Sequence, residues 1–440
     1  VNQQSFKPRL YENKIDFDRM RMYRLNRVRD QLVKHDVGAC ILFDPINIRY
    51  ATDTRNMSIF AMHIMLRYLF IPANGPVILF EYPKCGNLSK DFCTVDEVRF
   101  AETWDYFSAG DNLYRNAKRW ATVVDDLMKN YVSENKNIAI DILDPAGINA
   151  LKDNYNYRLH NAQKFLEIGR SIKSEDEILC MQASVKNAEK GIIKMHENLQ
   201  ASMTEEELWA YLHKTNVETG GEWFDARLLS SGPRTNPWFR ECSMRKIEKG
   251  DMVSFDTDLI GPYGYCSDIS RSWICGDNPN EEQRRLYSNA YEQIEKNISV
   301  LKAGMSFREL SEKCWHIPDE FCTNRYPEII HGVGLEDEYP IVYHIDDFEV
   351  MKYTVWYNQT RYVNFLSLEP LENTNDVGYT YGYEDWDEVD SDIDYNRTII
   401  TSEEEETDWD DSHLEEYNLE REGDIIGVDA DEYDSSYVKK

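Results

Sequence analysis

Three aspartates in one short stretch are the residues of this sequence best suited to carry out chemistry. Asp256 and Asp258 are one residue apart, and Asp268 follows ten residues later. Apolar residues precede Asp256, a turn rich in Gly and Pro follows Asp258, and a second alternating run carries Asp268, which predicts a β-hairpin. Carboxylates held this close repel one another, so one pKa must rise unless a cation lies between them. Hard oxygen ligands suit Mn, Fe, Co or Mg, and the hairpin therefore predicts a site for one divalent metal ion or a pair.

The alternative reading of the hairpin is an acidic surface turn. The chain contains 80 Asp and Glu residues, so clusters of acidic residues also arise by chance. Further along, His331 lies in a glycine-punctuated turn after two isoleucines, and Glu369 and Glu384 follow it. A lone histidine is usually structural. Three Asp, one His and two Glu together, however, make up the donor set of a two-metal carboxylate site.

The elements that would carry these residues fall into two halves. In the first half we expect an amphipathic helix over residues 17–35, strands at 39–43, 76–82 and 137–142, and a basic helix between the last two strands. Strands that alternate with helices indicate an α/β domain that ends near residue 165.

In the second half, a long helix is expected to begin within residues 169–192, and another spans about 281–301. Thr204 with Glu207, and Ser306 with Glu309, form capping boxes, and Gly220 is placed to end the helix that Thr204 begins. Helices that flank antiparallel strands favour an α+β lobe with the metal in its sheet. After residue 390 the periodicity fades into an acidic run, whose fold the sequence does not specify.

Composition narrows the classes of protein to consider. The net charge of the 440 residues is −31, and residues 381–440 alone hold 23 acidic against 4 basic residues, which disfavours nucleic acids and anionic membranes as partners. No apolar run is long enough to span a membrane, and the first residues lack the apolar core of a signal peptide. Nine scattered cysteines fit reduced thiols. We therefore expect a cytoplasmic protein that binds neither membranes nor nucleic acids.

The order of the candidate ligands resembles that of the creatinase, prolidase and methionine aminopeptidase superfamily, the pita-bread metalloenzymes, in which they come as Asp, Asp, His, Glu, Glu. The likeness runs from about residue 15 to 390. It implies a creatinase-like α/β domain over residues 1–165, a pita-bread metal-binding domain over 166–390, and an acidic tail over 391–440. The implied metal ligands are Asp256 or Asp258, Asp268, His331, Glu369 and Glu384.

Within this superfamily the sequence looks most like the DddP-type dimethylsulfoniopropionate (DMSP) lyases. In that branch all three aspartates of the hairpin fall on metal-binding positions. The resemblance implies one or two divalent transition-metal ions, iron first and Mn, Co or Zn as alternatives, a homodimer, and DMSP, a small zwitterion, as the substrate that is cleaved to dimethyl sulfide and acrylate. Four stretches carry the likeness: residues 43–57, 230–242, 255–273 and 331–340.

The same resemblance suggests roles for residues around the metal. The base that removes the substrate proton falls on Asp337, although Glu336 and Glu338 are not distinguished from it by sequence alone. Tyr326 matches a substrate-binding tyrosine, and its aromatic ring would face the sulfonium. Phe60 stands where these lyases usually have Trp.

Two departures from the peptidases bear on the reaction. Trp238, which we place with the substrate-binding residues, and Asp337 stand where peptidases of this fold usually have histidines that support peptide cleavage. An Xaa-Pro peptidase or creatinase-like metallohydrolase therefore remains the first alternative to a lyase. The second is a non-catalytic pita-bread protein whose acidic tail binds basic partners, although the chain keeps a full set of metal ligands.

Overall fold

The computed structural model describes residues 14–132, 134–322, 325–326 and 328–344. Glu369, Glu384 and the predicted acidic tail lie outside the described residues. Among the residues described, no helix combines the length and the apolar character needed to cross a membrane. All nine cysteines are described, and none of them forms a disulfide, as the sequence predicts.

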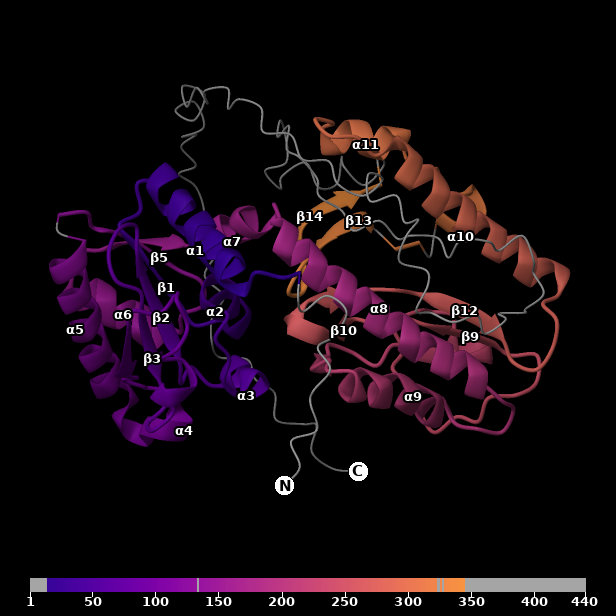
Figure 1. The fold of residues 1–440 in the computed structure, drawn as a ribbon, viewed down its shortest axis with the longest axis horizontal. Helices are drawn as coiled ribbons and strands as arrows, with labels where there is room; N and C mark the ends of the chain where they lie inside the picture. Colours follow the sequence, from indigo (N-terminus) through magenta and orange to yellow (C-terminus); the bar gives the residue numbers. More distant parts are fainter. Residues whose placement is uncertain (1–13, 133, 323–324, 327, 345–440) are drawn as a thin grey trace, which may run out of the picture. The chain divides into compact units, whose positions relative to one another are not determined.

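A six-stranded mixed sheet forms the first half of the chain (Figure 1). Its strand order is β4-β3-β2-β1-β5-β6. The pairs β1–β2 and β2–β3 are antiparallel, while β1–β5, β3–β4 and β5–β6 are parallel. The strands are β1 (Ala39–Leu42), β2 (Tyr68–Pro72), β3 (Ile78–Glu81), β4 (Glu97–Phe100), β5 (Asn137–Ile140) and β6 (Arg158–Asn161).

Helices cover both faces of this sheet, because alternate residues of each strand point to opposite faces. In β1, Ala39 and Ile41 pack with residues of α5 and α6, whereas Cys40 and Leu42 pack with residues of α1, α2 and α7. Figure 1 shows α5 and α6 on one side of the sheet and α1 on the other. The helices are α1 (Phe17–Lys34), α2 (Pro45–Thr52), α3 (Ser58–His63), α4 (Tyr106–Ala109), α5 (Leu113–Tyr131), α6 (Pro145–Asn154) and α7 (Gln163–Arg170), with short 3-10 turns η1 (Gly86–Leu88) and η2 (Gly110–Asn112).

Short antiparallel strands form the second half, where α8 packs on α9 and both cover one face of the strands. The described residues of this half form three sheets, with strand orders β12-β9-β8, β11-β10-β7 and β13-β14. The strands are β7 (Trp223–Phe224), β8 (Leu229–Ser231), β9 (Met252–Phe255), β10 (Leu259–Ile260), β11 (Cys266–Ser267), β12 (Arg271–Ile274), β13 (Glu328–Val333) and β14 (Asp337–Tyr343). The helices are α8 (Glu175–Asn198), α9 (Glu205–Glu218), α10 (Glu281–Val300), α11 (Phe307–Lys313) and α12 (Asp319–Cys322), with 3-10 turns η3 (Gly232–Arg234) and η4 (Pro262–Gly264).

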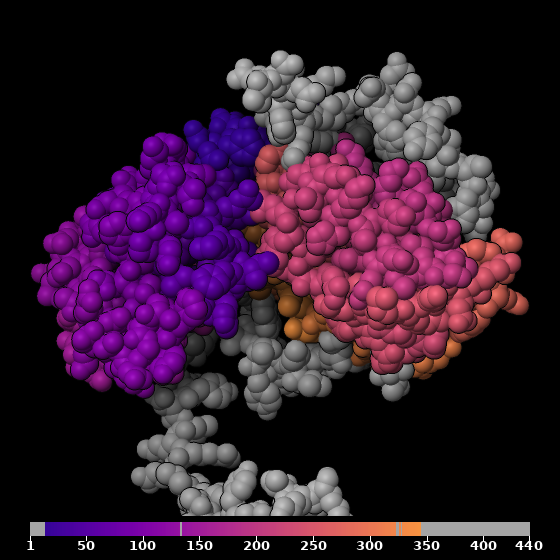
Figure 2. Space-filling view, turned by 90° about the horizontal axis from the view of Figure 1, so that it is seen from below, coloured from indigo at the N-terminus to yellow at the C-terminus, as the bar shows by residue number. Residues whose placement is uncertain are grey.

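The two halves occupy separate regions of the surface. In the space-filling view of Figure 2, indigo and purple atoms of the first half form one region, and magenta to orange atoms of the second half form another. The predicted order, an α/β half followed by an α+β half, is confirmed.

Most predicted elements are present, with small shifts at their ends. The Thr204–Glu207 capping box makes both of its hydrogen bonds, and Gly220, with φ +92°, follows the end of α9. Ser306 caps α11 through the Glu309 backbone N–H, which is one of the two bonds that a capping box makes. The predicted hairpin is correct in outline, although it consists of two successive strand pairs rather than one.

Candidate metal centre

The two strand pairs place the three aspartates at their junction. β9 pairs with β12, and β10 pairs with β11, both antiparallel. Asp256 follows β9 directly and Asp258 precedes β10, while Asp268 lies on the returning chain between β11 and β12. Asp258 has a φ of +34°, in the left-handed region that few residues other than Gly adopt. The break between the strand pairs thus turns all three carboxylates toward one point.

Thr257, between the first two aspartates, holds this junction together. Its side chain is fully buried, its hydroxyl donates to the Ser267 carbonyl, and the same hydroxyl accepts a 2.9 Å hydrogen bond from the Ile269 backbone N–H. These two bonds join the outgoing and the returning chain on both sides of Asp268. They fix the separation of the carboxylates where the regular strand pairing is interrupted.

The carboxylates form a cluster of the size that a metal ion requires. Asp256, Asp258 and Asp268 each offer an oxygen, and these oxygens lie within 4.8 Å of one another. A second group within the same limit consists of Asp268, His331 and Asp337. Asp268 belongs to both groups and is therefore the residue that the two share.

His331 comes from β13, and its ring is held at both nitrogens. Nε2 lies 3.1 Å from Oδ2 of Asp268, and Nδ1 lies 3.1 Å from the carbonyl oxygen of Gly332. A proton on Nδ1 that is donated to this carbonyl leaves Nε2 as the nitrogen available to a metal. The register of β13 with β14 shifts between His331 and Gly332, and this irregularity turns the imidazole toward Asp268.

The electrostatics of the cluster favour a cation. Burial and the neighbouring Asp268 raise the pKa of Asp256 to about 9, and burial and the same neighbour raise that of Asp258 to about 7. Burial by itself would also raise the pKa of Asp268, but hydrogen bonds from His331 and Asp256 leave it below its ordinary value. Three oxygen donors and one imidazole nitrogen suit a divalent first-row transition metal, which would relieve this repulsion. The residues present therefore fit the predicted ion.

Asp337, the predicted base, lies beside this cluster. Its Oδ1 is 3.9 Å from Nδ1 of His331 and 3.9 Å from the Cys266 Sγ, and 48% of its side chain is exposed. Burial and Asp268 raise the pKa of Asp337 to about 6. The side chain is near enough to act on a molecule bound at the cluster and open enough to exchange a proton with water.

Two further acidic residues, Asp225 and Glu336, lie near the cluster. Asp225 was not predicted from the sequence, and Glu336 was considered only as an alternative to Asp337 as the base. Asp225 follows β7, and its backbone N–H donates to the Asp258 carbonyl at 3.1 Å. Both carboxylate oxygens of Glu336 are buried, and burial and a side-chain hydrogen bond with Asp225 raise the pKa of Glu336 to about 10. The sequence signal for Asp225 was an acidic residue directly after an apolar pair, Trp223 and Phe224.

The predicted aromatic residues lie in different places. Tyr326 is half exposed, and its ring centroid is 5.3 Å from that of Phe239. Burial and the neighbouring Glu328 raise the pKa of Tyr326 most, and the charges of Asp337 and Asp268 raise it further. Trp238, next to Phe239, is partly buried. Phe60 is on α3 in the first half, where its ring packs edge-on against Phe107 at 6.0 Å, and it is not part of the carboxylate groups described above.

Comparison with known proteins agrees with this geometry. Residues 179–370 match the model of metallopeptidase family M24. The dimethylsulfoniopropionate lyase DddP of Roseovarius nubinhibens is 38% identical over 337 residues, which is 75% of each chain, and that of Roseobacter denitrificans is 35% identical over the same shares. The prolidase of Thermococcus sibiricus superimposes with a TM-score of 0.59 at 22% identity over 75% of this chain and 85% of its own, which supports the fold alone.

The two lyases are similar to this chain over three quarters of its length. The peptidase-family model covers the second half, where the described ligands lie. The chain therefore belongs to the DddP family of dimethylsulfoniopropionate lyases, within metallopeptidase family M24.

Proposed function

We propose that this protein cleaves dimethylsulfoniopropionate to dimethyl sulfide and acrylate by β-elimination at the carboxylate cluster. The observation that supports this reaction most directly is the placement of Asp337 beside the Asp268–His331 pair, where it can act as a base. The 38% identity to a DMSP lyase over 75% of the chain supports DMSP as the substrate.

The metal would be held by Asp256, Asp258, Asp268 and His331, and Glu369 and Glu384 are proposed to complete the set. When bound, a divalent ion supplies Lewis-acid stabilisation of the negative charge that develops beside the substrate carboxylate. We infer iron by family likeness, while Mn, Co or Zn would suit the same donors. We also propose that the protein is a homodimer and that it acts in the cytoplasm.

The residues of the chain account for the proton and the leaving group. Asp337 takes the proton from the carbon next to the substrate carboxylate, and that C–H electron pair becomes the new carbon–carbon double bond. The carbon–sulfur bond breaks, its electron pair stays on sulfur, and dimethyl sulfide leaves as a neutral molecule. The exposed side of Asp337 then returns the proton to water. Tyr326 offers an aromatic face to the sulfonium before cleavage, an interaction of about 0.5–2 kcal/mol.

The test is a pair of substitutions in the purified protein. Asp337→Asn keeps the shape of the side chain and removes its basicity, so release of dimethyl sulfide should fall by about 10²–10⁴-fold while the metal content is unchanged. Asp268→Ala should lose both activity and metal, because the Asp268 carboxylate lies within 4.8 Å of donor atoms of Asp256, Asp258 and His331, the other described ligands. Headspace gas chromatography and elemental analysis measure the two quantities.

Two results would contradict this proposal. Near-normal turnover of the Asp337→Asn variant would mean that another residue is the base. A parent protein that releases no dimethyl sulfide and instead hydrolyses an Xaa-Pro dipeptide would be a peptidase.

A further inference from the structure

A buried group of charges lies directly behind the proposed base. Asp337 and Glu338 are neighbours on β14, and successive side chains of a strand point to opposite sides. The Asp337 side chain is 48% exposed and faces His331, whereas the Glu338 side chain is only 1% exposed. The strand thus presents one carboxylate to the cluster and buries the next one.

Two positively charged side chains from outside the sheet, those of Lys173 and Arg170, form ion pairs with Glu338. Lys173 donates a short hydrogen bond to Oε1 of Glu338, and Nε of Arg170 lies 2.9 Å from Oε2 in an ion pair. The side chains of Lys173 and Arg170 are 3% and 5% exposed. Buried ions are stable only when paired, so each member of this group depends on the others for its place.

The same segment also holds the backbone of β14. Glu167, on α7 one turn before Arg170, accepts a 2.9 Å hydrogen bond from the Tyr339 backbone N–H, and its other oxygen accepts from Arg170. Arg170 in turn donates at 2.8 Å to the side-chain oxygen of Asn47 on α2. Glu338 and Tyr339, the two residues that follow Asp337, are thereby tied to α7.

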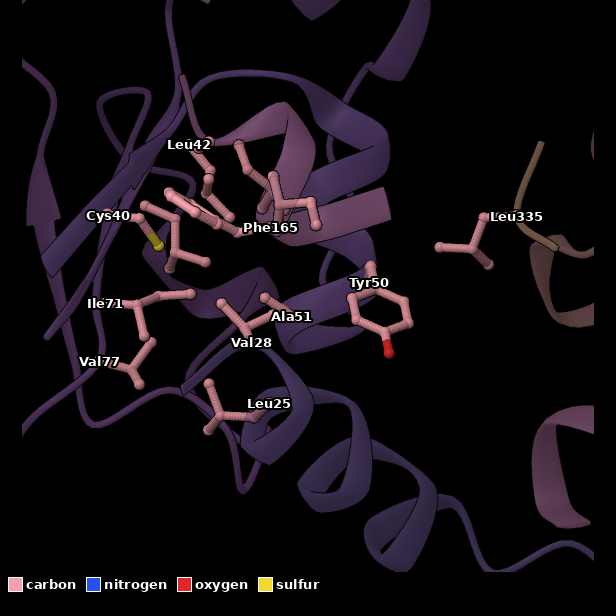
Figure 3. Packing of buried hydrophobic residues seen from close by; sticks show 14 of the residues in the cluster. Leu25, Val28, Cys40, Leu42, Tyr50, Ala51, Ile71, Val77, Phe165 and Leu335 are labelled. Atoms are coloured by element: carbon pink, nitrogen blue, oxygen red, sulfur yellow. The ribbon is translucent and has the colours of Figure 1, made fainter. Parts of the chain in front are cut away.

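The turn before Asp337 is fitted to this arrangement. A side chain at Gly334 would place its Cβ 2.2 Å from Oε1 of Glu338, so the glycine leaves room for the carboxylate. Leu335, in the same turn, is 2% exposed and belongs to the core that contains Tyr50 of α2 (Figure 3). Leu335 thus packs in the same core as α2, while the charged contacts of Glu338 hold the strand after the turn to Arg170 of α7 and to Lys173.

From this arrangement we propose that Lys173 and Arg170 are positioning residues for Asp337, acting through Glu338. The inference rests on the proposed function, since it assigns Asp337 as the base. In the part of the chain that the structure describes, the side chains of Lys173 and Arg170 pair with Glu338 and not with the carboxylates of the cluster. Their part is to hold β14 so that Asp337 stands beside Asp268 and His331, and a misplaced base reacts slowly even when metal and substrate are bound.

The experiment compares Lys173→Met in two backgrounds. In the otherwise unchanged protein, kcat for release of dimethyl sulfide should fall about 10–100-fold, while KM and metal content change less than about twofold. In the Asp337→Asn background, Lys173→Met should change kcat less than about twofold, because the base through which it acts is already absent. Lys173→Arg, which keeps the cation, should restore most of the activity.

A matched control separates positioning from general stability. Arg67 and Glu81 form an equally buried pair in the first half, with side chains 4% and 1% exposed. Arg67→Met should lower the urea midpoint of unfolding as Lys173→Met does, yet leave kcat per folded molecule unchanged. Should Lys173→Met fail to fold, Lys173→Gln, which keeps a hydrogen-bond donor, takes its place in the same comparison.

Equal losses of kcat in the two backgrounds, or loss of metal from the Lys173→Met protein, would overturn the inference. A crystal structure of the variant decides the matter independently of activity. Displacement of the Asp337 carboxylate from His331 supports positioning, and an unmoved carboxylate refutes it. A parent protein without lyase activity would refute the proposed function instead, and the displacement would still be measurable.

Discussion

At the scale of single residues, the carboxylates of Asp256, Asp258 and Asp268 stabilise the fold only in the presence of a cation. Their oxygens lie within 4.8 Å of one another, so their like charges repel. The site is arranged for binding at the expense of the stability of the metal-free protein.

One substitution should therefore have opposite effects on the stability of the metal-free protein and on metal binding. Asp256→Asn should raise the free energy of unfolding of the metal-free protein by about 1–2 kcal/mol at pH 7, because it removes a carboxyl group whose raised pKa forces it to take up a proton on folding. The same variant should bind metal more weakly and lose the stabilisation that added metal gives the parent. Urea denaturation with a chelator and then with the metal measures both, and a variant less stable than the parent under chelator would contradict the argument.

Much of this site could be predicted from residue types and spacing. The pattern around Asp256, Asp258 and Asp268 specified a hairpin, and His331 was recognisable by its glycines. The position of Asp225 near the cluster depends on how β7 pairs with β10, and the burial of Glu336 depends on packing between segments far apart in the sequence, so neither could be placed from a local pattern. The placements of Glu369 and Glu384 stay predictions.

At the scale of elements, the junction between the strand pairs β9–β12 and β10–β11 decides where the ligands point. A single regular hairpin would turn successive side chains to alternate faces. Asp256 and Asp258 lie outside the regular strands, where the positive φ of Asp258 is possible. The hairpin was predictable from its turn and apolar runs, whereas the interruption was not, because it depends on the buried Thr257 and its bonds across the hairpin.

The role of Thr257 in holding the junction can be tested by exchanging its hydroxyl for a methyl group. Thr257→Val leaves the Ser267 carbonyl and the Ile269 N–H without a partner, which should cost about 2–4 kcal/mol of folding free energy. Metal affinity should fall as well, since the carboxylates on either side lose their fixed separation. Thr257→Ser keeps the hydroxyl and serves as the control. Chemical denaturation and metal titration measure the two effects, and equal behaviour of the two variants would disprove the role.

At the scale of the whole molecule, an ion pair joins Arg49 of α2 in the first half to Glu222, the residue before β7 in the second half. Arg49 donates to both carboxylate oxygens of Glu222, at 2.7 and 2.8 Å, and Arg55 pairs with the same carboxylate. Burial by itself would raise the pKa of Glu222, but the hydrogen bonds and charge of Arg49 leave it below the ordinary 4.5. A lowered pKa means that ionised Glu222 stabilises the folded protein.

The stability that Glu222 contributes should therefore depend on pH. It is fully present above about pH 4.5, the ordinary value, and is lost as the pH falls through the lower pKa of the folded state. Glu222→Gln should be less stable than the parent by about 1–3 kcal/mol at pH 7, and the difference should shrink as the pH falls below 4.5. Urea unfolding across this range measures it, and a difference that is constant with pH would exclude the ion pair as its cause.

The core that contains Leu335 has a consequence for the order in which the protein is made. This core gathers Leu25, Tyr50 and Phe165 from the first half, yet it also takes Tyr265 and Leu335 from the second. At about 5–20 residues per second, a ribosome needs roughly 9 to 34 seconds to advance from Phe165 to Leu335. During that interval the nascent first half carries an apolar face that its own residues do not cover. A chaperone that binds apolar segments would therefore find its target on this chain before the metal ligands are complete.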